Sequence, residues 1–326
     1  MIELEQVTKR FPDGSVAVDA LTLEIPSGTV SVLVGSSGCG KTTTLRMINR
    51  MEEPTSGTLR IDGVDVARQP LHVLRRSIGY VIQQGGLFPH RKVLDNITTV
   101  PRLLGWPKER ARSAALEMMQ LVGLDPTLAT RYPVQLSGGQ QQRVGVARAL
   151  VTEPPVLLMD EPFGAVDPLV RAQLQMEFAQ LQRRLGTTVV FVTHDIGEAL
   201  ALGDRIAVLG KGARVHQYST PAELLAAPAD EFVTGFVGPD RHVALLGLTP
   251  AAAVRRRAVE ELPEGVDVAT LPRIDVTAPN ATARWMLDAA LATAAGYVAV
   301  TDAAGATTGV VHLADVALAG HAVAEQ

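Results

Sequence analysis

The chain has 326 residues, of which 47% are hydrophobic and 4% are aromatic, and its formal net charge is −4. This length predicts about two domains with enough apolar surface for a hydrophobic core. The small negative charge argues against nucleic acid as a partner, because domains that bind nucleic acid generally carry a basic surface.

Three further features bear on the compartment. The N-terminal residues Met1 to Glu5 lack the basic and apolar regions of a secretory signal, so no signal peptide is expected here. Cys39 is the only cysteine, which excludes an intramolecular disulfide and favours a reducing, cytosolic compartment. The uncharged stretch from Ala289 to Thr301 is shorter than the roughly 18–20 apolar residues that a bilayer crossing needs. If the protein takes part in transport, another polypeptide is expected to form the channel.

Strands are predicted in the N-terminal region, where short β-like runs between Val7 and Ile25 flank the turn Pro12-Asp13-Gly14-Ser15. A further apolar run at Val30–Val34 leads into the segment Gly35–Thr42, which has the pattern G-x-x-x-x-G-K-[ST]. Apolar residues at helical spacing then predict a helix over Thr42–Met51. The glycine-rich segment therefore lies between a strand and a helix N-terminus, as a phosphate-binding loop requires.

The residue types in this loop suit the phosphates of a nucleotide such as ATP. Glycines let backbone N–H groups approach the phosphates, Lys41 places a positive charge on the β and γ oxygens, and the Thr42 hydroxyl can coordinate Mg²⁺. A chance glycine-rich turn is the alternative, and the flanking strand and helix argue against it. The predicted nucleotide-binding residues of the loop are Gly35, Ser36, Ser37, Gly38, Cys39, Gly40, Lys41, Thr42 and Thr43.

An inserted helical subdomain is predicted from about residue 86 to residue 150, where amphipathic stretches are interrupted by prolines. Within it, Ser137, Gly138, Gly139 and Gln140 stand at the start of a helix, where a hydroxyl, free N–H groups and the helix dipole can bind a second anion. The chain is thus expected to carry two different phosphate-binding surfaces, and each of them occurs only once in the sequence. A twofold homodimer is expected, in which each copy closes over the ATP held by the other.

An α/β core is predicted, because strand-like runs at Val156–Met159 and Thr188–Val192 enclose a helical stretch at Leu169–Leu185. The first of these strands runs into Asp160 and Glu161. Asp160 is expected to support Mg²⁺ and Glu161 to polarise the attacking water as a general base. A helix-capping acidic pair is the alternative, although capping and catalysis do not exclude each other.

His194 follows the second strand and can reach a γ-phosphate from the strand end, where it would polarise the phosphate or orient the water. A purely structural histidine is the alternative. The Gln83 amide could contact Mg²⁺ or water, but an exposed glutamine in a turn explains it as well. Phe11 could stack on an adenine ring or belong to the core.

The phosphate loop together with Leu136-Ser137-Gly138-Gly139-Gln140 resembles the ATP-binding subunit of ABC transporters over residues 1–239. The resemblance implies an α/β P-loop ABC ATPase core with an antiparallel β subdomain, and ATP and Mg²⁺ as cofactors. It also implies roles for five residues. Gln83 would be the Q-loop glutamine, Asp160 and Glu161 the Walker B pair, Asp167 the D-loop aspartate that meets the partner subunit, and His194 the switch histidine.

Two segments, residues 47–57 and 78–84, further resemble the glycine betaine, carnitine and choline importers. This resemblance implies the ATP-hydrolysing motor of an osmoprotectant importer, peripheral on the cytoplasmic side of the cell membrane. Its partners would be transmembrane permease subunits, contacted through Gly85–Asn96, and an external substrate-binding protein. An amino-acid or polyamine importer is the alternative, and a soluble ABC ATPase outside transport is a further one.

Residues 240–326 are predicted to form a small second domain, because the composition becomes rich in alanine beyond Gly238-Pro239. Strands are predicted at Tyr297–Thr301 and Gly309–Leu313, followed by a helix. The stretch Val298–Leu318 resembles the second half of a CBS motif, which implies an α+β regulatory or dimerisation domain. Arg255-Arg256-Arg257 is expected to be a solvated helix face.

Overall fold

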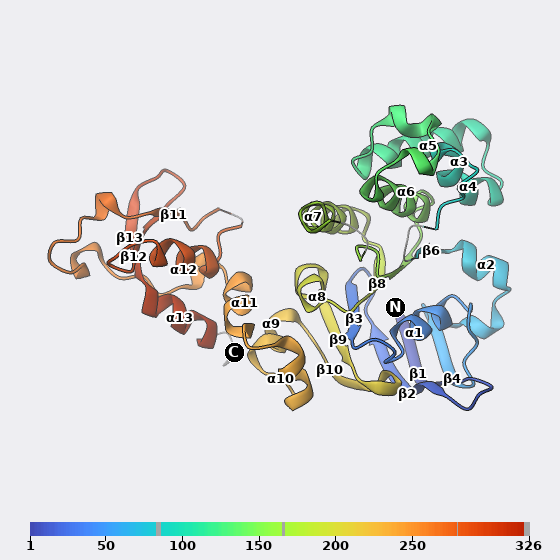
Figure 1. Cartoon of the computed structure of the whole chain (residues 1–326), viewed down its shortest axis with the longest axis horizontal. Coiled ribbons are helices and arrows are strands. Elements are labelled where there is room, and N and C mark those ends of the chain that lie inside the picture. Colours follow the sequence, from blue (N-terminus) through green and yellow to red (C-terminus); the bar gives the residue numbers. More distant parts are fainter. Residues whose placement is uncertain (83–85, 165–166, 279, 323–326) are drawn as a thin grey trace. The chain divides into compact units, whose positions relative to one another are not determined.

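The computed structural model of the chain describes residues 1–82, 86–164, 167–278 and 280–322. It divides into two compact units, Met1–Tyr218 and Ser219–Gln326, which are shown in Figure 1. Among the helices of the described residues, none combines the length and the hydropathy that a bilayer crossing requires.

The first unit begins with an antiparallel sheet whose strand order is β2-β1-β4-β5. Alternate residues of β2, namely Leu21, Leu23 and Ile25, are buried, as expected for a sheet with one face on the core. The two predicted N-terminal strands are therefore confirmed. The elements of this region are β1 (Ile2–Arg10), β2 (Val16–Ile25), β4 (Ser56–Ile61), β5 (Val64–Asp65), η1 (Val66–Arg68) and α2 (Leu71–Arg76).

A six-stranded sheet with the order β10-β9-β3-β8-β7-β6 forms the centre of the unit. The strands from β9 to β6 pair in parallel, and β3, β7 and β8 are buried along their whole length. Such burial on both faces explains their continuous apolar sequences. The strands are β3 (Val30–Gly35), β6 (Ile78–Val81), β7 (Val156–Asp160), β8 (Thr188–Thr193), β9 (Arg205–Leu209) and β10 (Val215–Ser219). The helices between them are α1 (Lys41–Ile48), α7 (Pro168–Leu185), α8 (Ile196–Leu202) and η4 (Lys211–Ala213).

One hydrophobic core connects the two sheets. It includes Ile2 and Leu4 from β1, Leu33 from β3, Leu45 from α1 and Leu158 from β7, all nearly inaccessible to solvent. Each fully buried side chain of this size contributes about 1.5–3 kcal/mol. This shared core holds α1, and with it the phosphate loop, against the ends of the central strands.

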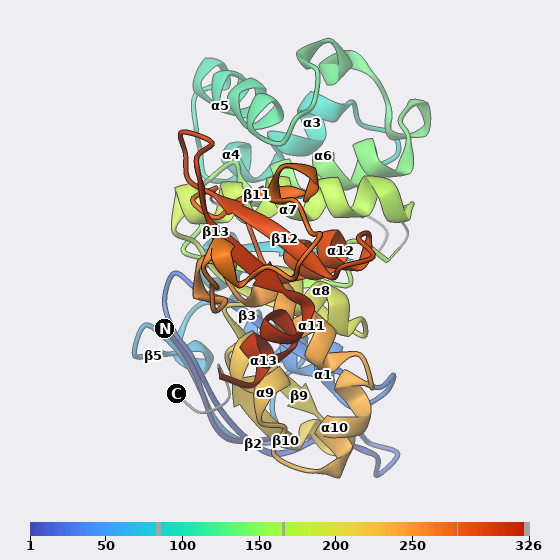
Figure 2. The same ribbon diagram turned by 90° about the vertical axis from the view of Figure 1, so that its left-hand side faces the viewer.

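Between β6 and β7, every regular element of residues 86–150 is a helix. The four α-helices lie together as a group in both ribbon views (Figures 1 and 2). Pro107 directly precedes α5, and Ser137 caps the N-terminus of α6. The elements are α3 (Val93–Ile97), α4 (Thr99–Leu103), α5 (Lys108–Leu121), η2 (Pro126–Thr130), η3 (Pro133–Gln135) and α6 (Gly138–Leu150).

The second unit has a core of its own and a three-stranded sheet with the order β11-β12-β13. The strands β11 and β12 are parallel, and β12 and β13 are antiparallel. Both predicted strands and the helix that follows them are confirmed. The elements are α9 (Pro221–Ala226), α10 (Glu231–Val237), α11 (Arg241–Leu248), η5 (Ala251–Ala253), η6 (Val259–Glu261), η7 (Val268–Thr270), β11 (Arg273–Asp275), α12 (Ala283–Leu291), β12 (Tyr297–Thr301), β13 (Thr307–His312) and α13 (Leu313–Ala322).

Two details of this unit differ from the sequence-based expectations. The division after Tyr218 precedes the predicted boundary after residue 239, because α9 packs against α11 and so belongs with the second unit. Arg255–Arg257 is not helical, so the prediction of a helix face is wrong. The backbone of Arg257 forms an antiparallel bridge with Val310, and its guanidinium binds Asp315.

Candidate active site

Three parallel strands place the predicted catalytic segments at one edge of the central sheet. The phosphate loop follows β3, Asp160 and Glu161 stand at the end of β7, and His194 follows β8. Because β8 lies between β3 and β7 in the sheet, the carboxyl ends of these strands are neighbours. This edge is where α/β sheets generally bind their ligands.

The phosphate loop is shaped by its glycines at the N-terminus of α1. Gly40 has φ 115°, and a Cβ atom there would lie 2.3 Å from the carbonyl oxygen of Ala17, so no larger residue fits. Ser36, Ser37 and Gly38 are exposed, whereas Cys39 and Gly40 are buried. The exposed part of the loop thus faces solvent, where it can receive a phosphate at the positive end of the helix.

Lys41 is 5% exposed, and its ammonium group is satisfied by the loop itself. Its Nζ donates to the carbonyl oxygens of Gly35 at 2.7 Å and Ser36 at 2.9 Å. A buried cation needs such partners. Phosphate oxygens can take their place, because they offer the same kind of acceptor with a negative charge.

Thr42 and Asp160 lie together behind the loop. The Thr42 hydroxyl donates to Asp160 Oδ1 at 3.0 Å, and Asp160 is 7% exposed. Burial raises the pKa of Asp160, while the hydrogen bond from Thr42 and the charge of Arg46 act in the opposite direction. A hydroxyl and a carboxylate at this distance are the hard oxygen donors that Mg²⁺ prefers, so these residues fit the ion. Thr43, next along α1, is half-buried.

Glu161 and His194 are in direct contact, with 3.2 Å between Glu161 Oε1 and His194 Nδ1. Glu161 has φ 44°, in the left-handed region, and its backbone N–H donates to the Val192 carbonyl oxygen at 2.9 Å. Non-glycine residues are strained in this conformation and concentrate at functional sites. His194 is 62% exposed at its side chain, so an incoming ligand can reach it.

The segment Ser137–Gln140 forms a capping box at the start of α6. The backbone N–H of Gln140 donates to Ser137 Oγ at 3.3 Å, and the backbone N–H of Ser137 donates to Gln140 Oε1 at 3.0 Å. The S-x-x-Q spacing is the sequence signal for this motif, which the sequence analysis missed. A pocket of about 320 Å³ adjoins it, lined by Ser137, Gly139, Gln140 and Arg143 among others.

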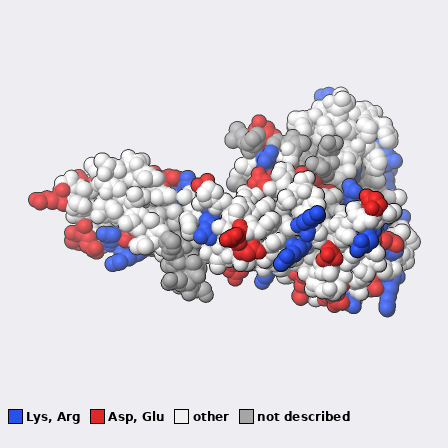
Figure 3. Space-filling model, turned by 60° about the horizontal axis from the view of Figure 1, so that its bottom comes forward, with Lys and Arg blue, Asp and Glu red and all other residues white. Residues whose placement is uncertain are grey.

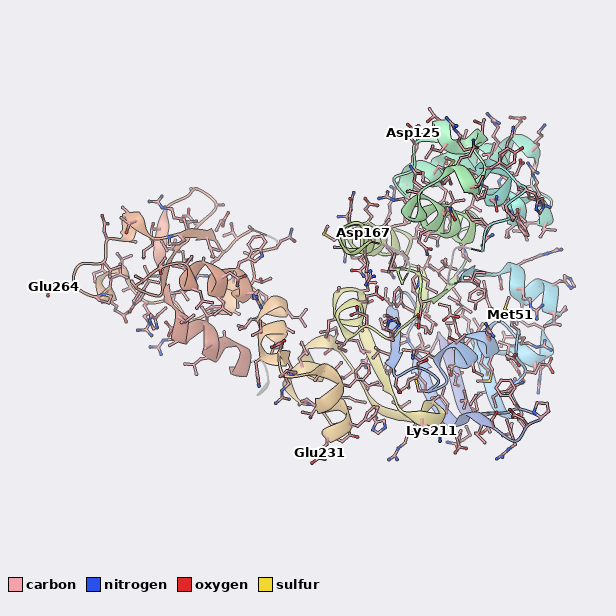
Figure 4. All side chains as sticks on the ribbon, in the orientation of Figure 1. Met51, Asp125, Asp167, Lys211, Glu231 and Glu264 are labelled. Atoms are coloured by element: carbon pink, nitrogen blue, oxygen red, sulfur yellow. The ribbon has the colours of Figure 1, made fainter. Side chains whose placement is uncertain are left out.

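The remaining predicted residues are placed as follows. Asp167 is exposed directly before α7, and its carbonyl oxygen accepts a hydrogen bond from the Arg171 N–H at 2.8 Å (Figure 4). Phe11 is half-buried between β1 and β2, with the Lys9 ammonium 5.2 Å from its ring centroid. Gln83 lies outside the described residues.

Sequence and structure comparisons place this geometry in a family. The profile described as ABC transporter matches residues 18–164. The osmoprotectant import ATP-binding protein OsmV of Salmonella typhimurium is 54% identical over 259 residues, which cover 78% of this chain and 68% of the relative. The chain belongs to the ABC transporter ATP-binding proteins.

Further comparisons place this ABC ATP-binding protein in the same family. The glycine betaine/carnitine/choline transport ATP-binding protein OpuCA of Bacillus subtilis is 53% identical, and the match covers 74% of the chain but 64% of that relative, less than two thirds. A dimeric, post-hydrolysis ATP-binding cassette bound to ADP and Pi has a TM-score of 0.62 at 35% identity, covering 68% of this chain and 99% of that chain. The predicted α/β fold of a P-loop ABC ATPase is therefore confirmed.

The sequence analysis missed one charged residue that lies beside Thr42 and Asp160. Arg46 lines an open pocket together with Thr42, Tyr80 and Asp160, and its charge opposes the rise in the pKa of Asp160 that burial causes. Its position four residues after Thr42 on α1, hence on the same helix face, is the signal that could have identified it. Arg46 adds a cation beside the group expected to hold Mg²⁺.

Proposed function

We propose that this protein is the ATP-hydrolysing motor subunit of an ABC importer for osmoprotectants of the glycine betaine, carnitine and choline type. The observation that carries the ATPase part is the contact between Glu161 and His194, at the same sheet edge as the Thr42–Asp160 pair. A carboxylate and an imidazole beside a phosphate loop are the groups that proton transfer from an attacking water requires.

ATP is proposed to bind across the exposed loop Ser36–Gly38 and the N-terminus of α1. On binding, Lys41 Nζ exchanges the carbonyl oxygens of Gly35 and Ser36 for phosphate oxygens. Thr42, Asp160 and the predicted Gln83 would hold Mg²⁺, which when bound offsets negative charge on the phosphates. Phe11 is proposed to stack on the adenine, since it is only half-buried and already carries a cation near its ring.

Glu161 is proposed to accept the proton of the attacking water, with His194 orienting the carboxylate and the γ-phosphate. The Ser137–Gln140 segment of a second copy is proposed to close over the phosphates, and Asp167 to meet that copy. The exposure of Ser137, Gly138 and Asp167 supports this arrangement, because residues that bind across a dimer must be accessible in the single chain.

The substrate class rests on the relatives, whose names state osmoprotectant import and glycine betaine, carnitine and choline transport. By the same reasoning we infer transmembrane permease subunits and an external binding protein as partners, and a peripheral position on the cytoplasmic side of the membrane. The segment Gly85–Asn96 is proposed to contact the permease. The second unit is proposed to be a CBS-like regulatory or dimerisation domain.

The alternative of a nucleic-acid-associated ATPase has less support. On the face drawn in Figure 3, basic and acidic side chains are interspersed among uncharged ones. Nucleic-acid-binding surfaces instead gather Lys and Arg on one face. Uptake of amino acids or polyamines remains the rival within transport, and the transport assay below separates it.

The hydrolysis proposal is tested with Glu161→Gln. We expect this variant to bind ATP as the wild type does and to lose hydrolysis by roughly 100-fold or more, because the general base is removed. ATP-dependent dimers should accumulate in size-exclusion chromatography. Glu153→Gln is the matched control, since Glu153 also has a positive φ, 49° against 44°, but lies in the loop before β7. Brisk hydrolysis by Glu161→Gln would overturn the assigned role.

The substrate proposal is tested in vesicles that contain this subunit with the permease and the binding protein. Uptake of labelled glycine betaine, carnitine or choline that stops with Glu161→Gln is the expected result. Uptake of labelled spermidine or an amino acid instead would retain the motor and reject the substrate class.

A further inference from the structure

The Thr193 hydroxyl fixes the backbone on both sides of His194. Thr193, the last residue of β8, is 1% exposed, and its Oγ1 accepts a hydrogen bond from the Asp195 N–H at 3.0 Å. The same hydroxyl donates to Glu198 Oε2 at 2.7 Å in a buried environment. The turn that carries the exposed His194 side chain is therefore held from the protein interior.

Glu198 is a buried carboxylate on the first turn of α8, with 6% of its surface exposed. Burial raises its pKa, and the hydrogen bond from Thr193 opposes that rise. Burying a carboxylate is costly, and an apolar side chain would pack α8 against the sheet at lower cost. What the carboxylate adds is two directional acceptor oxygens, one of which is used by Thr193.

The other oxygen faces α7. Gln175 Nε2 donates to Glu198 Oε1 at 3.2 Å, and Arg171 Nε lies 3.9 Å from the same oxygen. Arg171 also lies 3.8 Å from Asp195 Oδ2, and its backbone N–H binds the carbonyl oxygen of Asp167. One carboxylate thus connects the His194 turn to the first turns of the helix that begins just after Asp167.

We propose that Glu198 is a positioning residue for ATP hydrolysis, which holds the His194 turn through Thr193 and couples it through Arg171 and Gln175 to the Asp167 end of α7. The proposal rests on the proposed ATPase function. Glu198 itself does not contact the nucleotide. It sets the distance between His194 and Glu161, so that a shift of α7 at Asp167 is transmitted to His194.

The test compares two valine substitutions in the same strand of the full-length protein. Thr193→Val removes the hydroxyl that links Glu198 to the His194 turn. Thr188→Val is the matched control: Thr188 is also buried in β8, at 5% exposed, but its hydroxyl accepts a hydrogen bond from the Gly28 N–H at the opposite end of the strand. Glu198→Gln is the second variant. Its amide oxygen can still accept the hydrogen bond from Thr193, but its amide N–H groups cannot accept from Gln175 or pair with Arg171, which are donors themselves.

Two readouts separate positioning from folding. The first is kcat and KM for ATP. The second is the imidazole Cε1–H signal of His194 in NMR spectra, assigned among the seven histidines by its loss in His194→Ala. We expect Thr193→Val to lower kcat by roughly 10-fold to 100-fold, since small misplacements of catalytic groups have effects of this size. In Thr193→Val, KM should change little and the His194 signal should shift. Thr188→Val should leave both kcat and the His194 signal unchanged.

The decisive comparison is made in a His194→Ala background, with residual hydrolysis measured in single turnovers. If Thr193 and Glu198 act through His194, then Thr193→Val causes no further loss there, because the group it positions is already absent. An equal fold-loss in both backgrounds overturns the proposal, as does an unshifted His194 signal in both Thr193→Val and Glu198→Gln. A wild-type protein without ATPase activity would refute the proposed function, while the NMR comparison would still decide the positioning.

Discussion

Two aspartates illustrate how the surroundings of a residue decide its role. Asp160 is buried beside the neutral Thr42 hydroxyl, and burial raises its pKa; its proposed role is to bind a cation. Asp315 in the second unit already has its cation. Arg257 Nε lies 2.6 Å from Asp315 Oδ2, and this hydrogen bond lowers the pKa of Asp315 below its ordinary value of 3.8. The first carboxylate suits ligand binding, and the second suits structural stability.

The role of Asp315 leads to a prediction about pH. A carboxyl group whose pKa is lower in the folded state stabilises the fold above its unfolded pKa, and this contribution is lost as the pH falls through the folded pKa. Asp315→Asn should lower the unfolding midpoint of the second unit by roughly 5–10 °C at neutral pH. The difference from wild type should begin to shrink below about pH 4, where Asp315 of the unfolded chain becomes protonated, and should vanish as the pH falls through the lower pKa of the folded state.

Thermal unfolding followed by circular dichroism at a series of pH values measures this difference. Asp288→Asn is the control, because Asp288 pairs with Arg284 on the exposed surface of α12. Exposed pairs of this kind contribute little. A difference between wild type and Asp315→Asn that does not depend on pH would contradict the ion-pair explanation.

At the scale of elements, helix N-termini combine a structural and a functional role. The capping box of α6 uses the Ser137 side chain to satisfy a backbone N–H of the helix it begins. The same hydroxyl is the group proposed to face the ATP of a second copy. Stability and activity must therefore be separated when this residue is changed.

The matched helix for that separation is α9, whose capping box is formed by Thr220 and Glu223. Ser137→Ala and Thr220→Ala should each reduce the free energy of unfolding by about 1 kcal/mol, the usual cost of a lost N-cap. Only Ser137→Ala should also reduce ATP hydrolysis and ATP-dependent dimerisation. Denaturant titration and steady-state ATPase assays measure the two effects. Equal activity of both variants would show that Ser137 acts only as a cap.

The sheet elements explain which strands were predictable. The runs at β3, β7 and β8 are continuous and apolar because both faces are covered, and the sequence analysis recognised all three. β10 was missed, because every one of its residues is half-buried and no clear period appears in its sequence. The short strand β11 was missed for a related reason, since three residues are too few to show a period.

On the scale of the whole molecule, the chain contains two units with separate hydrophobic cores. Separate cores predict separate unfolding transitions. The residues proposed to bind the nucleotide belong to the first unit, so ATP should raise only the transition of that unit. A 100-fold excess of ATP over its Kd should add about 2.7 kcal/mol to the stability of the first unit.

Differential scanning calorimetry with and without ATP tests this prediction, and the two tryptophans assign the transitions. Trp106 reports on the first unit and Trp285 on the second, so Trp106→Phe and Trp285→Phe leave one fluorescent reporter each. ATP should shift the transition seen by Trp106 and leave that of Trp285 unchanged. A single transition that shifts as a whole with ATP would show that the two units unfold together.

The sequence by itself determined the phosphate loop, the Ser137–Gln140 segment, the acidic end of β7 and the α/β class. These features are contained in contiguous residues, so local composition and periodicity are sufficient to identify them. The contacts of Thr42 with Asp160, of Glu161 with His194 and of Arg257 with Asp315 were decided only by the tertiary structure. They depend on strand order and packing, which bring together residues far apart in the chain, and no local pattern in one sequence encodes that distance.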